Sequence, residues 1–414
     1  MATGSAAAQR GFATDLRVAL QKASSANTTK TNQAKDSIFA KWTLFCQQLG
    51  HSAALHLVQG KEEKLCYMLV FGLRYRQRKG PSGKPVRADT VADALAAVGQ
   101  GIANLGGVDP RKAFPGAREN DPLLASFLKA LSDDDDPKTR AYPANLTILE
   151  ALYKYLDVND AKWGTFNAHT IDLAIVAFFW LLRPSEHLEG TGETRTEAFE
   201  FQDVEVNIDG KYYLAPAAPL NDERILNRMR YSQLIFSDQK NAVRGEKVGH
   251  TANDDPRLCP VKALGRVVRR LQLWGAPPNT PLYRHYNSYD KQWYSIKPHN
   301  ITNALRHAAT GLQPETGIDP FLLSARSLRP GGATALLLAG VTTDNIGLLG
   351  RWRSDAIFTY LRIQAAALTG RFSQRKLEYG RYTFAPGVYG QPDALPTQAT
   401  PAMRDILGHS ELYD

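Results

Sequence analysis

Apolar residues recur at helical spacing along most of this 414-residue chain, and this spacing is what most limits the folds open to it. The clearest case begins near Ser37 and stops at Gly50, which is typical of an amphipathic helix with a glycine C-cap. Similar patterns predict further helices over residues 64–75, 88–105, 145–156, 169–182, 260–274 and roughly 301 to 360. We therefore expect a mainly α-helical protein.

The period becomes strand-like only between residues 201 and 250. Residues 201–208 alternate roughly, Asp209-Gly210 is a strong hairpin turn signal, and residues 211–214 resume strand-type side chains. A second hairpin is predicted over 231–250, with Lys240 at the end of its first strand and Gly245 closing the turn. These segments predict a small antiparallel β-sheet inside the helical fold.

The length favours two compact units, and 43% hydrophobic with 22% charged residues is typical of a globular protein with a buried core. The acidic run from Ser132 to Pro137 and the KTRAYP sequence that follows it are charged and turn-rich, as in an interdomain linker. We predict a flexible N-terminal tail over 1–34, a helical domain over 35–131, a linker over 132–143, a larger domain over 144–372 and a tail over 373–414.

Positive charge suggests a polyphosphate partner. Lys and Arg number 50 against 41 Asp and Glu, giving a net charge of +9. A cluster of basic residues lies in one Gly/Pro-containing loop, where contact with DNA phosphates is one interpretation and a solvated surface loop is the other. They are Arg76, Arg78, Lys79, Lys84 and Arg87.

Cys46, Cys66 and Cys259 are too far apart for a metal motif, and their odd number argues against a disulfide framework, so we expect a reducing compartment. The longest apolar run, residues 171–182, is too short for a membrane span, so we expect no membrane partner. The N-terminal segment lacks the apolar core of a secretory signal. It suits a disordered tail, or an organellar transit peptide.

Four motifs combine residues that a phosphodiester-cleaving site needs. They are Leu181-Leu-Arg-Pro-Ser-Glu186, Phe236-Ser-Asp-Gln-Lys-Asn241, Arg326-Ser-Leu-Arg-Pro-Gly-Gly-Ala-Thr334 and Leu348-Leu-Gly-Arg-Trp-Arg-Ser-Asp-Ala-Ile-Phe-Thr-Tyr360-Leu-Arg362. Their order and spacing over residues 140–365 resemble the catalytic domain of tyrosine recombinases, or phage-type integrases, particularly the crypton type from eukaryotic mobile elements. The family pattern is Arg-x-x-Glu, a hairpin Lys, His-x-x-Arg, Leu-Gly-His (or Trp) and Tyr.

The resemblance implies a helical, SAM-like core-binding domain followed by the tyrosine recombinase catalytic domain. It implies double-stranded DNA as substrate and a tetramer of protomers on two DNA sites, with a C-terminal tail that docks on a neighbouring protomer. It implies neither a cofactor nor a metal. A eukaryotic mobile element would place the protein in the nucleus, and otherwise we expect the cytoplasm or nucleoid.

The residue types suit strand transfer. Planar guanidinium groups meet phosphate oxygens bidentately, so Arg183 and Arg329 are the candidates for a phosphate clamp, and Glu186 would orient Arg183. By resemblance, Tyr360 would attack the scissile phosphate, form a 3′-phosphotyrosine and release a 5′-hydroxyl. Lys240 would protonate the leaving oxygen. Because the covalent bond conserves energy, the resemblance implies no ATP.

Two positions depart from the family pattern. Arg326 stands where a histidine is expected, and Arg351 falls on the later His or Trp position, with Trp352 one residue away. Arginine stays protonated, so it cannot act as a base, but it donates hydrogen bonds to phosphate. We expect these changes to weaken catalysis without abolishing it.

Each candidate also has a structural interpretation. Arg183 could cap a helix, and Tyr360 could pack in the core. Lys240 could be an ordinary surface lysine, since Lys211 and Lys247 lie on neighbouring predicted strands.

We expect His250 and His307 to be structural or solvated. As alternatives to a recombinase, the chain could be a non-catalytic DNA-binding protein that kept the fold, or an enzyme similar to type IB topoisomerases.

Overall fold

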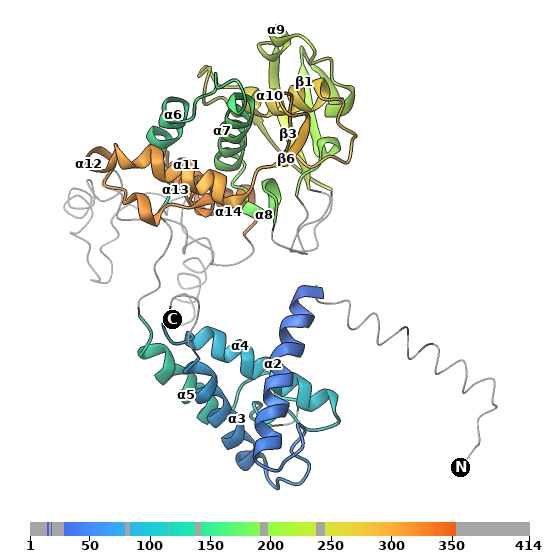
Figure 1. The fold of residues 1–414 in the computed structure, drawn as a ribbon, viewed down its shortest axis with the longest axis vertical. Coiled ribbons are helices and arrows are strands. Elements are labelled where there is room, and N and C mark those ends of the chain that lie inside the picture. Colours follow the sequence, from blue (N-terminus) through green and yellow to red (C-terminus); the bar gives the residue numbers. More distant parts are fainter. Residues whose placement is uncertain are drawn as a thin grey trace, which may run out of the picture. The chain divides into compact units, whose positions relative to one another are not determined.

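A computed structural model describes residues 29–78, 83–114, 116–136, 142–190, 198–236 and 245–352, together with Asp15 and Val18. The chain divides into two compact units, residues 1–138 and 139–414. Their described parts consist mainly of helices with a small antiparallel sheet, so the predicted fold class is confirmed (Figure 1).

The N-terminal unit is built from the helices α2 (Thr29–Gln48), α3 (Lys61–Arg76), α4 (Ala88–Asn104) and α5 (Pro122–Asp133). Trp42, Met68 and Val91 are fully buried in its core, which shares no residue with the core of the second unit. Helix α2 starts at Thr29, inside the segment that we expected to be a flexible tail, because its polar first turns extend the amphipathic helix upstream.

Helix α5 was not predicted. It begins after Asp121, whose side chain accepts a hydrogen bond from the Leu123 amide, and has Pro122 in its first turn. It reaches Asp133, so it takes in the start of the predicted linker 132–143. Further along, Asp135 pairs with Arg76 of α3 and ties this acidic run to the N-terminal unit.

The second unit contains more helices and two sheets. Its helices are α6 (Leu146–Tyr155), α7 (Gly164–Phe179), α8 (Pro184–His187), α9 (Glu223–Leu226), α10 (Pro260–Leu273), α11 (Pro298–Thr310), α12 (Gln313–Thr316), α13 (Leu328–Leu338) and α14 (Thr343–Gly350). Helix α7 is buried along most of its length and contacts α6, α10, α11 and α13 (Figure 1). It is the central helix of this unit, and its end leads into the candidate site.

The main sheet has the strand order β2-β1-β3-β4, all antiparallel. Its strands are β1 (Val204–Ile208), β2 (Lys211–Leu214), β3 (Met229–Phe236) and β4 (Glu246–Thr251). The Asp209-Gly210 turn has positive φ at both positions, 50° and 87°, as the dipeptide predicted. Helix α10 packs on β3 and β4, so both predicted hairpins join one core.

A further hairpin, β5 (Arg284–Asn287) and β6 (Gln292–Ser295), lies in the segment that we expected to be irregular. Its turn carries positive φ on Lys291, which is not a glycine. Cys46, Cys66 and Cys259 are free. None of the described helices is long and apolar enough to cross a membrane.

Candidate active site

The first arginine of the site, Arg183, lies just beyond the end of α7. The chain leaves α7 through Trp180 and Leu181, where Leu181 has a positive φ of 51°. Arg183 is then the N-cap of α8, and Pro184 follows it in the first turn. After this reversal the Arg183 side chain keeps 26% of its surface exposed, so it is accessible to a ligand.

Glu186 orients Arg183 as the sequence suggested. One carboxylate oxygen accepts a hydrogen bond from the Arg183 amide at 2.7 Å, and the other accepts from its guanidinium Nη1 at 2.8 Å. The Glu186 side chain is 1% exposed. Main chain and side chain of Arg183 are therefore held by the same buried group.

Arg329 approaches from the start of α13 and is 3% exposed. Its guanidinium donates to the carbonyl oxygens of Leu181, at 2.9 Å, and Gly350. Two glycines allow this packing, since a Cβ on Gly331 would meet a backbone oxygen at 2.0 Å and one on Gly332 would meet another at 2.1 Å. The Pro-Gly-Gly sequence is thus explained by α13 lying directly on neighbouring backbone.

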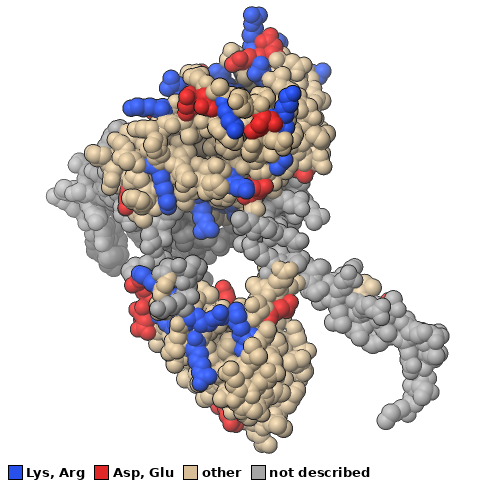
Figure 2. All heavy atoms as spheres, viewed as in Figure 1, with Lys and Arg blue, Asp and Glu red and all other residues tan. Residues whose placement is uncertain are grey.

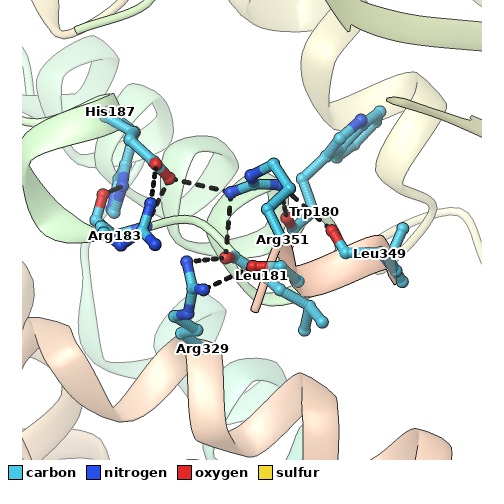
Figure 3. A network of polar contacts seen from close by, with 9 residues as sticks. Trp180, Leu181, Arg183, His187, Arg329, Leu349 and Arg351 are labelled. Atoms are coloured by element: carbon cyan, nitrogen blue, oxygen red, sulfur yellow. Dashed lines mark hydrogen bonds and ion pairs between the residues drawn. The ribbon is translucent and has the colours of Figure 1, made fainter. Parts of the chain in front are cut away.

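The third arginine, Arg351, follows α14 in the left-handed conformation, with φ 58°. Its guanidinium donates to Glu186 at 3.0 Å and to the carbonyls of Trp180 and Leu181 (Figure 3). It also lies over the Phe236 ring, 4.0 Å from the centroid. With its side chain 2% exposed, Arg351 is a buried member of the cluster.

Trp352 lies beside the predicted clamp. The Arg329 guanidinium is over its ring at 4.3 Å from the centroid, a cation–π contact. The sequence left open whether Arg351 or Trp352 occupies the family's late His or Trp position. The geometry puts the partly exposed Trp352 against Arg329 and pairs the buried Arg351 with Glu186.

The charges of the cluster keep Glu186 ionised. Burial by itself would raise the pKa of this carboxyl. The charge of Arg351, the Arg183 amide and the charges of Arg329 and Arg183 outweigh burial and hold the pKa below its ordinary value. The cluster thus gathers three guanidinium groups around one carboxylate. With Arg183 as its accessible member, it suits an anionic group such as a phosphodiester.

Three other predicted catalytic residues, Arg326, Lys240 and Tyr360, are not among the described members of this cluster. Arg326 is exposed on a 3₁₀ turn (Ala325–Ser327) just before α13, and none of its described contacts reaches the cluster. Lys240 and Tyr360 lie outside the described residues, as does Lys79 of the basic loop.

Lys211 and Lys247 lie on opposite edge strands of the main sheet, β2 and β4, and have contacts of their own. Lys247 of β4 lies 3.1 Å from the Glu205 carboxylate, and Lys211 of β2 lies over the Tyr213 ring. Neither contact leads to the arginine cluster.

Two residues of the cluster were missed from the sequence. His187 directly follows Glu186 and is 1% exposed, with its Nδ1 2.9 Å from the Arg183 carbonyl oxygen. Trp180 supplies a carbonyl to Arg351. His187 could have been found from the sequence, because it is a titratable residue directly after the Arg183–Glu186 motif. Trp180 could not, because no sequence pattern predicts which backbone carbonyl an arginine will bond.

His250 and His307 have structural contacts. His250 bonds the Phe179 carbonyl through Nε2 at 3.0 Å, and its ring packs edge-on against Trp180. His307 packs edge-on against the Tyr155 ring.

The basic loop of the N-terminal unit is partly neutralised. Arg76 donates to Asp135 at 2.9 Å, and Arg87 lies 3.9 Å from the same carboxylate. Lys84 pairs with Asp136 at 2.6 Å. The loop residues therefore differ in how far their charge is available to a phosphate.

Arg78 borders a separate feature, an open groove of about 260 Å³ between α2 and α3. The groove is also lined by Lys41 and Arg74, and Arg78 lies over the Tyr75 ring. Figure 2 shows Lys and Arg side chains gathered over one part of the N-terminal unit on this face. Among the described residues, no cluster of His, Cys, Asp and Glu has a metal-binding arrangement.

The chain is similar to solved DNA integrases at low identity. The Tn1549 transposon integrase in complex with transposon right end DNA is 13% identical, over 76% of this chain and 85% of that one, with a TM-score of 0.41. The same integrase with circular intermediate DNA is 14% identical, over 76% of this chain and 84% of that one, with a TM-score of 0.40. A lambda integrase dimer bound to a COC′ core site is 12% identical, over 74% of this chain and 90% of that one, with a TM-score of 0.32.

No family model and no curated protein matches the sequence. Because the TM-scores of these structures stay between 0.32 and 0.41, the fold assignment rests on this chain's own elements and packing.

Proposed function

We propose that this protein cleaves and rejoins double-stranded DNA as a site-specific recombinase or integrase of the tyrosine recombinase type. The observation that carries the proposal is the convergence of Arg183, Glu186 and Arg329 on one guanidinium-rich cluster, although Arg329 lies far along the chain from the other two. The sequence motifs selected these residues by order and type alone. Their spatial meeting is independent support.

The cluster is suited to stabilise charge that develops on a phosphodiester. Arg183 is the accessible cation, and Glu186 fixes its orientation. Arg329 is held by main-chain carbonyls and Trp352, so its charge is preorganised. Fixed cations of this kind stabilise a transition state without reorganising during the reaction. Arg351 contributes by holding Glu186.

The proposed chemistry is transesterification. The Tyr360 phenol gives up its proton to solvent, and its oxygen bonds to phosphorus as the bond to the 5′-oxygen breaks. Lys240 gives a proton to that leaving oxygen. The product is a 3′-phosphotyrosine and a free 5′-hydroxyl, and attack by a 5′-hydroxyl on the phosphotyrosine reseals the DNA. Because a phenol ordinarily has a pKa of about 10, neighbouring guanidinium charge would favour the reactive phenolate.

The proposal also includes an oligomeric state, a type of host element and a cellular location. A tetramer on two DNA sites, a mobile-element host of crypton type and a nuclear or nucleoid location all follow from the motif resemblance alone.

The test is to incubate the purified protein with DNA fragments that flank its gene and to look for a protein–DNA band that survives denaturation. We expect the band with the unmodified protein and none with Tyr360→Phe, because phenylalanine has no oxygen to bond phosphorus. Tyr289→Phe is the matched control and should keep the band, since Tyr289 is an exposed tyrosine of the β5–β6 turn, outside the arginine cluster.

Each other result has a meaning. A band that persists in Tyr360→Phe would remove Tyr360 as the nucleophile. Salt-sensitive DNA retention without any band would favour the non-catalytic DNA-binding protein. Relaxation of a supercoiled plasmid that lacks the flanking DNA would favour the topoisomerase-like alternative.

A further inference from the structure

His187 lies next to the clamp, and the proposed mechanism does not use it. It is the last residue of α8 and is 1% exposed. Its Nδ1 lies 2.9 Å from the Arg183 carbonyl oxygen. A carbonyl oxygen only accepts hydrogen bonds, so Nδ1 carries the proton and donates it.

The ring is neutral at physiological pH. Burial lowers the pKa of His187 to about 4, against the smaller opposing influence of the Arg183 carbonyl and Glu186. In this neutral tautomer Nε2 has a lone pair and no proton. Among the described residues, no group forms a hydrogen bond with this buried Nε2. The Nδ1 bond is therefore the ring's one defined hydrogen bond in the described part of the chain.

The bond acts in a short turn that contributes little helical stability of its own. Helix α8 spans four residues, about one turn, which is too short to be stable by its own propensity. The Arg183 carbonyl also accepts from the Glu186 amide at 2.9 Å, so the His187 bond adds a second constraint on the same oxygen. Figure 3 shows His187 and Arg183 side by side in this turn.

We propose that His187 is a positioning residue of the strand-transfer site, whose neutral ring fixes the Arg183 main chain and thereby the angle at which its guanidinium meets a phosphate. This inference rests on the proposed function, since that function assigns Arg183 to the phosphate. The Glu186 carboxylate holds the amide and the guanidinium of Arg183, and the His187 ring adds a second hydrogen bond to the Arg183 carbonyl.

Three substitutions of His187 distinguish the effect of its hydrogen bond from the effect of its volume in the buried site. In His187→Asn the amide N–H lies close to where Nδ1 was, so the bond to the Arg183 carbonyl can form. In His187→Gln the amide is displaced towards the Nε2 position, with similar polarity and more length. His187→Leu fills the space without a donor.

The first measurement is the Nε–Hε NMR signal of Arg183 in the full chain, assigned by its loss in Arg183→Lys. We expect the signal to shift or broaden in His187→Leu and His187→Gln and to return to its original position in His187→Asn. An unchanged Arg183 signal in all three variants would overturn the proposal. This readout needs no DNA and no activity.

The second measurement is the rate of adduct formation on the gene-flanking DNA fragments. A clamp displaced by about 1 Å costs up to about a hundredfold in rate. We therefore expect His187→Leu and His187→Gln to be slower by about tenfold to a hundredfold, and His187→Asn to recover most of that loss. Equal rates for the Asn and Gln variants would contradict a role through the Nδ1 bond.

The two measurements distinguish the two failures. If the unmodified protein forms no adduct but the Arg183 signal follows the donor as expected, the proposed function fails while the positioning of Arg183 by His187 stands. If adducts form and the Arg183 signal is the same in all three His187 variants, the recombinase proposal stands and this inference fails.

Discussion

At the scale of single residues, the unusual feature of the site is an arginine in a left-handed backbone conformation. Arg351 has φ 58°, a conformation that costs a non-glycine residue roughly 1–2 kcal/mol. Its guanidinium offsets this cost by meeting the Glu186 carboxylate and two carbonyl oxygens in a buried setting. Arg351 is therefore a structural residue that holds Glu186.

Glu186→Gln should destabilise the protein more than Arg351→Gln. The first change removes the carboxylate that three arginines face, whereas the second leaves Glu186 paired with Arg183. We expect losses in the free energy of unfolding of about 3–5 kcal/mol for Glu186→Gln, in the usual range for breaking a buried pair, and less for Arg351→Gln. Urea unfolding monitored by circular dichroism measures both.

The double variant provides the control. Because the two residues bond each other, the loss in Glu186→Gln/Arg351→Gln should be smaller than the sum of the single losses. Additive losses would show that the two side chains are not coupled.

At the scale of elements, the hairpin β3–β4 is fastened to the end of α7 by two hydrogen bonds. The Trp180 indole donates to the Val248 carbonyl at 2.9 Å, and His250 Nε2 donates to the Phe179 carbonyl at 3.0 Å. Phe236, at the end of β3, lies against Arg351. The same helix end thus supports the arginine cluster and the hairpin between whose strands Lys240 falls in the sequence.

His250 should make stability fall in mild acid. Burial lowers its folded-state pKa to about 4, from an ordinary value of 6.5, so the unfolded chain takes up the proton first as pH drops. Stability from this group is present above pH 6.5 and is lost between there and pH 4, by roughly 2–3 kcal/mol. His250→Gln keeps a donor for Phe179 and cannot be charged.

The comparison is between the two urea-unfolding profiles measured across that pH range. The unmodified protein should lose more stability on acidification than His250→Gln, by the amount above. Parallel profiles would mean that His250 is not buried as a neutral ring in solution. His187 and His285, whose pKa values burial also lowers to about 4, remain in both proteins and cancel in the comparison.

The elements show what local sequence determines. Helical periodicity predicted the long helices of the second unit, the Asp209-Gly210 turn predicted its first hairpin, and the strand-type segment 231–250 predicted the second, because these signals act within a few residues. The hairpin β5–β6 was missed because its strands have four residues each and its turn uses Lys291 in place of a glycine. Helix α5 was missed because an acidic run adjoins it.

In the candidate site, too, local contacts were predictable from the sequence and long-range contacts were not. The Arg183–Glu186 pair was predictable because its members are three residues apart on one turn. The partners of Arg329 and Arg351 were not, since they include backbone carbonyls, and long-range packing decides which carbonyls a guanidinium meets. The sequence motifs thus selected Glu186 and the clustered arginines, but also Arg326, none of whose described contacts reaches the cluster, and they missed His187. Tertiary structure decides which of these side chains face a ligand.

At the scale of the whole molecule, a net charge of +9 favours DNA, but individual cations in the basic loop differ in what they can contribute. Arg76 is committed to the fold, since its side chain is 13% exposed and is bonded to Asp135 and the Val86 carbonyl. Arg78 is exposed beside the groove. Two nearby basic residues thus have different roles: Arg76 stabilises the fold, and Arg78 is available to a phosphate.

Arg78→Gln should therefore weaken binding of the full chain to any duplex and reduce the slope of log K against log salt by about 1, the value for one lost phosphate contact. Arg76→Gln should leave that slope nearly unchanged and lower the free energy of unfolding by about 1–3 kcal/mol, because it removes the charged hydrogen-bond donor of Asp135. Fluorescence anisotropy over a salt series, with urea unfolding of both variants, measures the two effects. If Arg76→Gln changed the slope as much as Arg78→Gln, the Asp135 pair would have to open when DNA binds, and the loop would act as a single basic surface.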